Sequence, residues 1–413
     1  DHLLYTFKLR AGVKFHNGQE VTPEDVIWSY QRCGDANAPA DIIQVAAFAN
    51  VEMYQEGDDT VCFQLQEPNN EFASYLTTAV LPKDYTEQDT APVGTGPFKF
   101  VSRTAQESVV LERFDDYWGE KPDLTKVTYK IIENADSILL SLQSGAVDVF
   151  AHLTTTQIQQ LGDGFHVEEG TMNLVQALYL NNAEKPFDDV RVRQALCYAI
   201  DRQQILDLAF NGYGTLLGSS MYPAFSKYYM EELNDAYPYD VEKAKTLLAE
   251  SGFDTATPLR IVLNGNAIRK SIAQIMQGYL AQIGITVEIN SYEDSLFDTY
   301  KSDETAYDIL LDNCGGSDYL MTIWRGKFDA KAYSTGGTIN GVYDDELQSL
   351  MEACEKDNSK ANMDAFQDCL YSHAYAVGLF NAQMYTVCRD SVKSISMDGK
   401  QFPCVASCTY SWN

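Results

Sequence analysis

The chain has 413 residues, a length at which roughly two or three domains are expected. Its 59 acidic residues outnumber its 30 basic residues, and the net charge of −29 argues against a nucleic-acid partner, which needs clustered Lys and Arg. No apolar run approaches the roughly 20 residues of a membrane-spanning helix. The 45% hydrophobic content is typical of a globular protein.

The opening residues predict a strand, a turn and a helix in that order. Alternating apolar side chains over 5–9 indicate the strand, and His16–Gly18 is a turn signal. Thr22 is a suitable N-cap, Pro23 suits the first helical position, and Asp25 stands at the capping-box position. None of these groups forms a catalytic motif.

The rest of the first half predicts mainly strands. They are expected at 50–54, 60–65, 109–114, 127–132 and 147–150, with one helix at 135–143 ended by Gly145. The Gly-rich segment PVGTGPFKF, residues 92–100, is expected to be a loop entering a strand. The order strand, helix, strand over 127–150 predicts a parallel strand pair.

A second unit is expected to begin near Ala177, with the strand LYLNN. The expected helices lie at 187–210, as one long pattern capped by aspartates, and at 240–253, 344–354 and 361–376. Residues 259–292 predict strand, helix, strand, and 306–320 predict a strand ending in a Gly-rich loop. Short strands are expected at 379–388, 392–397 and 409–412. The whole pattern favours two α/β lobes joined by several crossings.

Enzyme and metal motifs are missing from the sequence. None of the five histidines lies in HExxH or beside a second histidine at ligand spacing, and GxSxG is absent. The segment Gly94–Phe98 lacks the third glycine of a dinucleotide fingerprint and the Lys-Ser/Thr of a P-loop. The acidic pairs at 115–116, 188–189 and 344–345 lie at turns or helix starts, where Asp acts as a cap. We therefore predict no catalytic residues, no metal ligands and no cofactor.

The nine cysteines are scattered and form no CxxC, so zinc-ribbon and thioredoxin chemistry have no support. Cys197, within RQALCYAI, is interpreted as a small core residue. The sequence leaves open whether Cys404 and Cys408 pair.

Polar and Gly-rich segments at the expected strand ends favour ligand binding over chemistry. In open α/β sheets, ligands bind outside the carboxyl ends of the strands, and glycine lets a ligand approach the backbone. The candidate ligand-binding residues on this ground are Gly94, Thr95, Gly96, Asn264, Asn266, Asn313, Gly315, Gly316, Ser317 and Asp318.

The segment YTFKLRAGVKFHNGQEVTPEDVIWSYQR resembles the signature of bacterial extracellular solute-binding proteins of family 5. These are the peptide-, oligopeptide- and nickel-binding receptors of ABC importers, and only Asn17 and Pro23 depart slightly from the usual form. The resemblance continues, in the family's order, in VGTGPFKF, LERFDDYWGEKP, ADSILLSLQSGAVDV, LYLNNAEKPFDDVRVRQALCYAIDRQQIL and DVEKAKTLLAESGF.

The resemblance implies a periplasmic-binding-protein-like clamshell of type II, with an extra subdomain in lobe one. Lobe one would cover 1–177, lobe two 178–383, and 384–413 would return to lobe one. Crossovers near Gln176–Leu180 and Ala382–Thr386 would form the hinge. Family members carry a signal or lipoprotein leader and an N-terminal strand segment before this point, so we expect this chain to be an N-terminally truncated member. We expect an extracytoplasmic protein, periplasmic or anchored at the cell surface.

The implied function is substrate binding for an ABC importer, by a monomer that delivers a peptide to a membrane permease. In peptide receptors of this type an acidic residue of lobe two binds the amino group of the peptide. The matching stretch is Leu310–Tyr319, in which Asp312 and Asp318 are the candidates and Tyr319 is a further candidate contact. The stretch lacks the family's Trp and Asp-Pro.

The arginine with which dipeptide receptors bind the ligand carboxylate has no counterpart at Leu263–Asn266, because Arg269 lies about a turn into the helix. An oligopeptide is therefore favoured over a dipeptide. The same fold serving an oligosaccharide or a nickel complex is the first alternative. A cleft enzyme that uses a carboxylate pair is the second, and a structural or adhesion protein is the least favoured.

Overall fold

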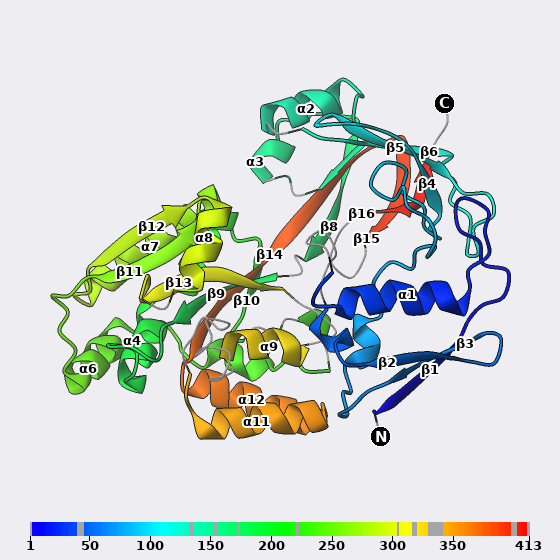
Figure 1. The fold of residues 1–413 in the computed structure, drawn as a ribbon. Helices are drawn as coiled ribbons and strands as arrows, with labels where there is room; N and C mark the ends of the chain where they lie inside the picture. The colour runs from blue at the N-terminus through cyan, green and yellow to red at the C-terminus, as the bar shows by residue number, and fades with distance from the viewer. Residues whose placement is uncertain are drawn as a thin grey trace. The chain divides into compact units, whose positions relative to one another are not determined.

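The computed structural model describes the chain except for residues 1, 39–44, 133–134, 152, 154, 172–173, 220, 222, 226, 304, 316–319, 329–341, 398–402 and 411–413. The chain divides into two compact units (Figure 1). Unit 1 comprises Asp1–Gly170 and Met384–Asn413, and unit 2 comprises Thr171–Gln383. Both units combine helices with sheets, which confirms the two-lobed α/β fold.

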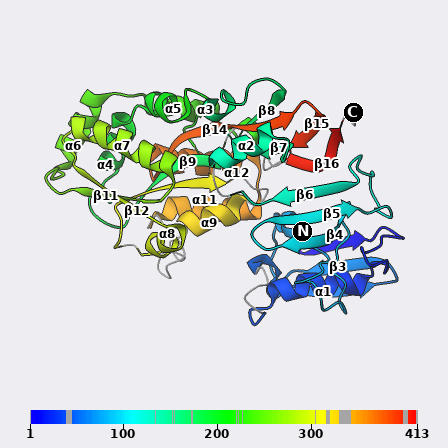
Figure 2. The same cartoon turned by 90° about the horizontal axis from the view of Figure 1, so that it is seen from above.

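Unit 1 is built from small sheets and short helices. Its elements are β1 (Leu4–Lys8), α1 (Pro23–Gly34), β2 (Glu52–Glu56), β3 (Thr60–Gln64), β4 (Phe98–Thr104), β5 (Ser108–Arg113), β6 (Lys126–Lys130), α2 (Ala135–Gln143), β7 (Val149–Ala151), α3 (Thr155–Ile158), β8 (Phe165–Thr171), β15 (Val392–Met397) and β16 (Pro403–Tyr410). Short 3-10 helices cover Ala46–Phe48 and Phe72–Tyr75. The strands β4, β5 and β6 form a separate antiparallel sheet (Figure 2).

The opening strand-turn-helix is confirmed, and its cap explains where α1 begins. The Thr22 side chain accepts a hydrogen bond from the Asp25 N–H, and the Asp25 carboxylate accepts one from the Thr22 N–H. This reciprocal pair satisfies two N–H groups that a helix start leaves unpaired. The strands β1, β3 and β2 form one antiparallel sheet that α1 contacts. The aromatic rings of Tyr30, Phe48 and Phe63 are buried between them.

The prediction of a parallel strand pair over 127–150 is wrong. Strand β6 pairs with β5 and strand β7 pairs with β14 (Ala376–Arg389), both in antiparallel orientation. The two strands flank α2 along the chain but belong to different sheets, so the helix is not a crossover between neighbours.

Unit 2 is a doubly covered sheet. Its elements are β9 (Leu174–Leu180), α4 (Val190–Ala199), α5 (Arg202–Phe210), β10 (Gly214–Leu216), α6 (Val241–Ser251), β11 (Leu259–Asn264), α7 (Ala267–Gln282), β12 (Val287–Tyr292), α8 (Asp294–Lys301), β13 (Ile309–Gly315), α9 (Leu320–Phe328), α11 (Asp345–Lys356), α12 (Lys360–Ser372) and the first part of β14. Short 3-10 helices cover Pro223–Phe225 and Glu231–Asp235. The strand order is β10-β14-β9-β13-β11-β12.

The two faces of this sheet bury separate cores. Leu263 and Leu311 face a core that contains side chains of α4, α5, α6 and α7, among them Ile272 of α7. The alternate strand residues, such as Leu310, face a second core formed by side chains of α8, α9, α11 and α12. Helices on both faces explain the continuous apolar sequences of β11 and β13.

Three predicted elements of the second half differ from the structure. The helix expected over 187–210 is two helices, because Ile200 is extended and the Asp201 side chain caps α5 by accepting a hydrogen bond from the Gln204 N–H. Helix α12 ends at Ser372 rather than Ala376, which is already the first residue of β14. Strand β16 spans Pro403–Tyr410 and therefore begins earlier than predicted.

Two smaller points concern cysteine and hydropathy. No disulfide joins Cys404 to Cys408. Within the described residues, no helix combines the length and the apolar character that crossing a membrane requires.

Candidate functional site

The parallel strands of unit 2 create a topological switch point. Strand β11 lies between β12 and β13 and is parallel to both. The chain leaves β11 toward α7, which packs on one face of the sheet, whereas α9, the next helix after β13, packs on the other face. Connections that diverge to opposite faces mark the carboxyl ends at which ligands bind in open α/β sheets. The candidate site is therefore the carboxyl edge of β11 and β13.

The edge carries a buried ion pair. Arg269 Nη2, in the first turn of α7, lies 3.1 Å from Asp312 Oδ1 of β13. The Arg269 side chain is 8% exposed and that of Asp312 is 15% exposed. The Asp312 carboxylate, a candidate amine ligand from the sequence, is thus already paired with a cation of the same unit.

Two asparagine side chains stabilise the loop after β11. The Asn264 Nδ2 donates to Asp294 Oδ1 at 3.1 Å, which joins the end of β11 to the start of α8. The Asn266 side chain caps α7 by accepting hydrogen bonds from the N–H groups of Ile268 and Arg269. Asn266 therefore has a structural role in addition to any contact with a ligand.

The Asn264 carboxamide also has an unused atom. Its Oδ1 is buried and has no hydrogen-bond partner. A buried acceptor without a hydrogen bond lowers the stability of the folded state unless a donor reaches it. Asn264 therefore has the capacity for an additional hydrogen bond, as do Ser291 of β12 and Gln176 of β9, whose Oγ and Oε1 atoms are likewise buried without a partner.

The remaining predicted residues of this region are placed as follows. Asn313 and Gly315 lie within β13 rather than in a loop after it, and Asn313 is paired in register with Gln176 of β9. Gly316, Ser317, Asp318 and Tyr319 lie outside the described residues. Tyr292, which ends β12, stacks on Tyr300 with ring centroids 4.3 Å apart.

The second predicted segment, Gly94–Gly96, belongs to unit 1 and precedes β4 rather than following a strand. The imidazole of His16 holds it: Nδ1 accepts from the Gly94 N–H at 3.2 Å, and Nε2 lies 3.0 Å from the Gly96 carbonyl. The Thr95 carbonyl accepts from the indole N–H of Trp118 at 3.2 Å. These contacts give the loop a structural role that the sequence did not reveal.

The His16 contacts predict a pH-dependent stability. Burial lowers the pKa of His16 below its ordinary value, and the neutral ring is the form that both accepts at Nδ1 and donates at Nε2. Because the pKa is lower in the folded state, the contribution to stability is present above the unfolded pKa of about 6.5 and is lost as the pH falls through the folded value.

We expect acidification from pH 8 to pH 5 to destabilise the wild type more than a His16→Gln variant. Urea unfolding at several pH values measures this difference. Parallel pH profiles for the two proteins would contradict the assignment.

The acidic pairs act as caps and surface ion pairs. Asp189 caps α4 and is bonded by Arg191, whose hydrogen bonds hold the pKa of Asp189 below its usual value. Asp344 caps α11. Asp115 and Asp116 pair with Arg113 and Lys14, respectively.

One group in the described part of the chain has metal-ligating atoms close together. A carboxylate oxygen of Asp344, one of Glu346 and the Cys369 sulfur lie within 4.8 Å of one another. Asp344 is engaged by the Leu347 N–H and the Tyr375 hydroxyl. Burial and the neighbouring carboxylates raise the pKa of Cys369 to about 12, so the thiol stays protonated. We interpret the cluster as part of the α11 cap.

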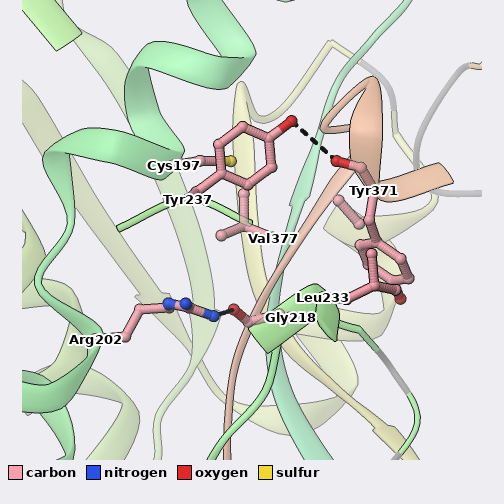
Figure 3. A pocket seen from close by; sticks show the side chains of 9 residues that line it. Cys197, Arg202, Gly218, Leu233, Tyr237, Tyr371 and Val377 are labelled. Atoms are coloured by element: carbon pink, nitrogen blue, oxygen red, sulfur yellow. Dashed lines mark hydrogen bonds between the residues drawn. The ribbon is translucent and has the colours of Figure 1, made fainter. Parts of the chain in front are cut away.

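Two hollows in unit 2 lie away from the carboxyl ends of β11 and β13. One cavity of about 10 Å³, enough for a single water, is lined by Cys197, Arg202, Tyr237 and Gly378 (Figure 3). An open groove of about 770 Å³ lies at the amino ends of β11 and β13, beside Leu259 and Asp308. Neither hollow includes a predicted ligand-binding residue.

The comparisons with known proteins identify the family. The model of the family described as bacterial extracellular solute-binding proteins, family 5 Middle, matches residues 1–328. Heme-binding protein A of Haemophilus influenzae is 27% identical over 422 residues, covering 93% of this chain and 72% of that protein. The dipeptide-binding protein of Escherichia coli K12 is 29% identical over 331 residues, covering 71% of this chain. The chain spans 61% of the length of the latter.

The fold is also found in solved structures. The crystal structure of a putative peptide binding protein AppA from Clostridium difficile has a TM-score of 0.88 and 23% identity, covering 100% of this chain and 90% of that one. At this identity the likeness shows the fold alone. Together with the family match over most of the chain, it means that this chain belongs to family 5 of the bacterial extracellular solute-binding proteins.

Proposed function

We propose that this chain is the substrate-binding component of an ABC importer and that its ligand is a peptide, with an oligopeptide favoured over a dipeptide. It would bind the peptide outside the cytoplasm without altering it and deliver it to a membrane permease. The observation that carries the proposal is the switch point of unit 2, where Asn264, Arg269 and Asp312 gather at the carboxyl ends of parallel strands.

The polar groups at this edge suit an extended peptide. The Asn264 Oδ1 offers an acceptor to a backbone N–H of the peptide. Peptides held mainly by their backbones are bound by such hydrogen bonds, while side chains occupy less specific space. A dipeptide receptor would instead need charges for both termini, and the charges here are paired with each other.

The proposal predicts ligand-induced stabilisation. Peptides of two to nine residues, a nickel complex and a set of oligosaccharides would be screened by thermal shift. A bound peptide at about 100 times its dissociation constant should stabilise the protein by about 2.7 kcal/mol. The bound peptide should be recovered intact by mass spectrometry.

Two results would contradict it. Stabilisation by sugars or metal complexes and not by peptides would assign the same fold to a non-peptide solute. Cleavage of the peptide that is abolished by one Asp substitution would identify an enzyme.

A further inference from the structure

The turn His16–Gly18 has a chemistry that neither the fold nor the proposed function uses. Four Asn-Gly sequences occur in the chain, at 17–18, 211–212, 264–265 and 340–341, and the last lies outside the described residues. In an Asn-Gly sequence the backbone nitrogen of glycine can attack the side-chain carbonyl carbon of asparagine, because no Cβ shields that nitrogen. Geometry and exposure decide which of the three described sequences reacts first.

The Asn17 side chain is placed for this attack by its own hydrogen bond. It is exposed at the tip of a hairpin that the Phe15 N–H closes by donating to the Gln19 carbonyl at 2.8 Å. The Asn17 Oδ1 accepts from the Gln19 N–H at 3.1 Å. This contact is an Asx turn, which folds Cγ back toward the Gly18 nitrogen. The Gln19 N–H also stabilises negative charge that develops on Oδ1 during the attack.

The surroundings of Gly18 leave room for the ring that results. Gly18 is exposed with φ +87°, and a Cβ added there would meet nothing within 4 Å. Two hydrogen bonds have to open first: the Gly18 N–H donates to the Phe15 carbonyl at 2.8 Å, and the Asn17 Nδ2 donates to Gln19 Oε1 at 2.8 Å. Both donors lie at the exposed tip, where local opening costs less than global unfolding.

The other two described sequences are less favourable. The Asn264 carboxamide donates to Asp294 at 3.1 Å and its Oδ1 is buried, so charge would develop on an oxygen shielded from water. At Asn211 the backbone is left-handed, with φ 54°, and forms the C-cap of α5. The Gly212 N–H donates to the Leu206 carbonyl at 3.2 Å as part of this cap, so freeing the nitrogen would undo a helix end.

We propose that Asn17 is a site of spontaneous modification, at which the Gly18 nitrogen converts the asparagine into aspartate and isoaspartate. A base removes the Gly18 N–H proton, the nitrogen bonds to Asn17 Cγ, and the Cγ–Nδ2 bond breaks. Ammonia leaves with a proton from the solvent, and a five-membered imide remains. Water then opens the imide at either carbonyl. The net reaction consumes one water and releases one ammonia, and nothing is oxidised or reduced.

Isoaspartate changes the contacts of the neighbouring His16. It adds one carbon to the main chain of the hairpin, in which the spacing of consecutive Cα atoms is otherwise fixed. The His16 N–H donates to the Gly94 carbonyl at 2.9 Å, and the His16 ring holds the Gly94–Gly96 segment through Nδ1 and Nε2. Isoaspartate at position 17 therefore weakens the attachment of that segment, whereas aspartate keeps both the main chain and the Asx acceptor.

The first experiment follows the modification itself. The full chain is incubated at pH 8 and at pH 6 in water labelled with heavy oxygen, digested, and mapped by mass spectrometry with fragmentation that separates aspartate from isoaspartate. Label should enter position 17 about tenfold or more faster at pH 8 than at pH 6, because a base removes the proton. It should enter there about tenfold or more faster than at Asn264. Asn17→Gln, which would need a six-membered ring, should take up no label at this position.

A synthetic peptide of residues 13–21 is the unfolded reference for this experiment. Conversion of the peptide without conversion of the protein over the same time would show that the turn protects Asn17, and would overturn the proposal. Equal labelling at Asn17 and Asn264 would also overturn it, because the turn would then have no part in selecting the site.

The second experiment tests the effect on the His16 contacts. Urea unfolding compares fresh and aged samples of the wild type, Asn17→Gln and His16→Gln. Ageing should lower the midpoint of the wild type and leave that of Asn17→Gln unchanged. It should lower that of His16→Gln by much less, because the contact that isoaspartate weakens is already absent. An equal loss in the wild type and in His16→Gln would refute the link between Asn17 and His16.

Discussion

A Gly218→Ala variant is expected to lose about 3 kcal/mol or more of folding free energy, which is at or beyond the usual cost of overpacking. A Cβ atom at this position would lie 1.7 Å from the Leu233 carbonyl oxygen and 2.1 Å from its carbon. Both obstacles are backbone atoms, so no rotamer change can relieve the contact. The Gly218 N–H also donates to Asn234 Oδ1 at 2.9 Å, which fixes the two segments together.

The matched control for this variant is Gly278→Ala on the exposed side of α7, where an added Cβ meets nothing within 4 Å. Alanine in a helix interior is favoured over glycine, so the control should gain about 0.5–1 kcal/mol. Urea unfolding of both variants gives the comparison. A Gly218→Ala midpoint equal to that of the wild type would show that the 218 and 233 backbones can separate without cost.

Local signals in the sequence were sufficient to predict most helix ends. Thr22 and Asp25 form the predicted capping box, and Asp240 and Gly252 begin and end α6 as expected. These features depend on contacts within a few residues, which a sequence displays directly. The break at Asp201 was missed although Asp201 is itself an N-cap, because the apolar spacing continues on both sides of it.

The strand ends of the candidate site were predictable, but their pairing was not. The alternation of strands and helices indicated that residues near Asn264 and Asp312 would lie at the carboxyl ends of neighbouring strands. The ion pair between Arg269 and Asp312 joins residues 43 positions apart, and it depends on the register of β11 with β13. No local pattern encodes that register, so the sequence predicts Asp312 as a candidate amine ligand but not its pairing with Arg269.

The Gly94–Gly96 loop illustrates the same limit in unit 1. Its glycines suggested close approach by a ligand, whereas the structure shows the loop bound to the imidazole of His16, 78 residues earlier. The sequence did identify His16 within a turn, but a turn signal says nothing about what a side chain contacts at long range. Whether the loop also contacts a ligand stays a prediction.

An Arg202→Met variant is expected to cost about 3 kcal/mol, because hydrogen bonds from a charged donor are worth about 1.5–3 kcal/mol and buried acceptors lose their partner. Arg202 Nη1 donates to the Leu217 carbonyl at 2.7 Å and lies 3.4 Å from that of Gly378, while Nη2 donates to the Asn234 carbonyl. One side chain of α5 thus contacts three segments: the residue after β10, the start of β14, and the 3-10 helix Glu231–Asp235.

The three carbonyls are bound by several N–H donors of the planar guanidinium, and not only by its positive charge. Burial lowers the pKa of Arg202, yet arginine stays protonated and presents its donors in fixed directions. Arg202→Lys should therefore recover only part of the loss, since an ammonium group cannot reach all three carbonyls at once. Gln203→Met, an exposed change on the same helix, is the control and should stay within about 0.5 kcal/mol of the wild type. Urea unfolding of the three variants ranks them, and a lysine variant as stable as the wild type would show that charge alone holds the segment.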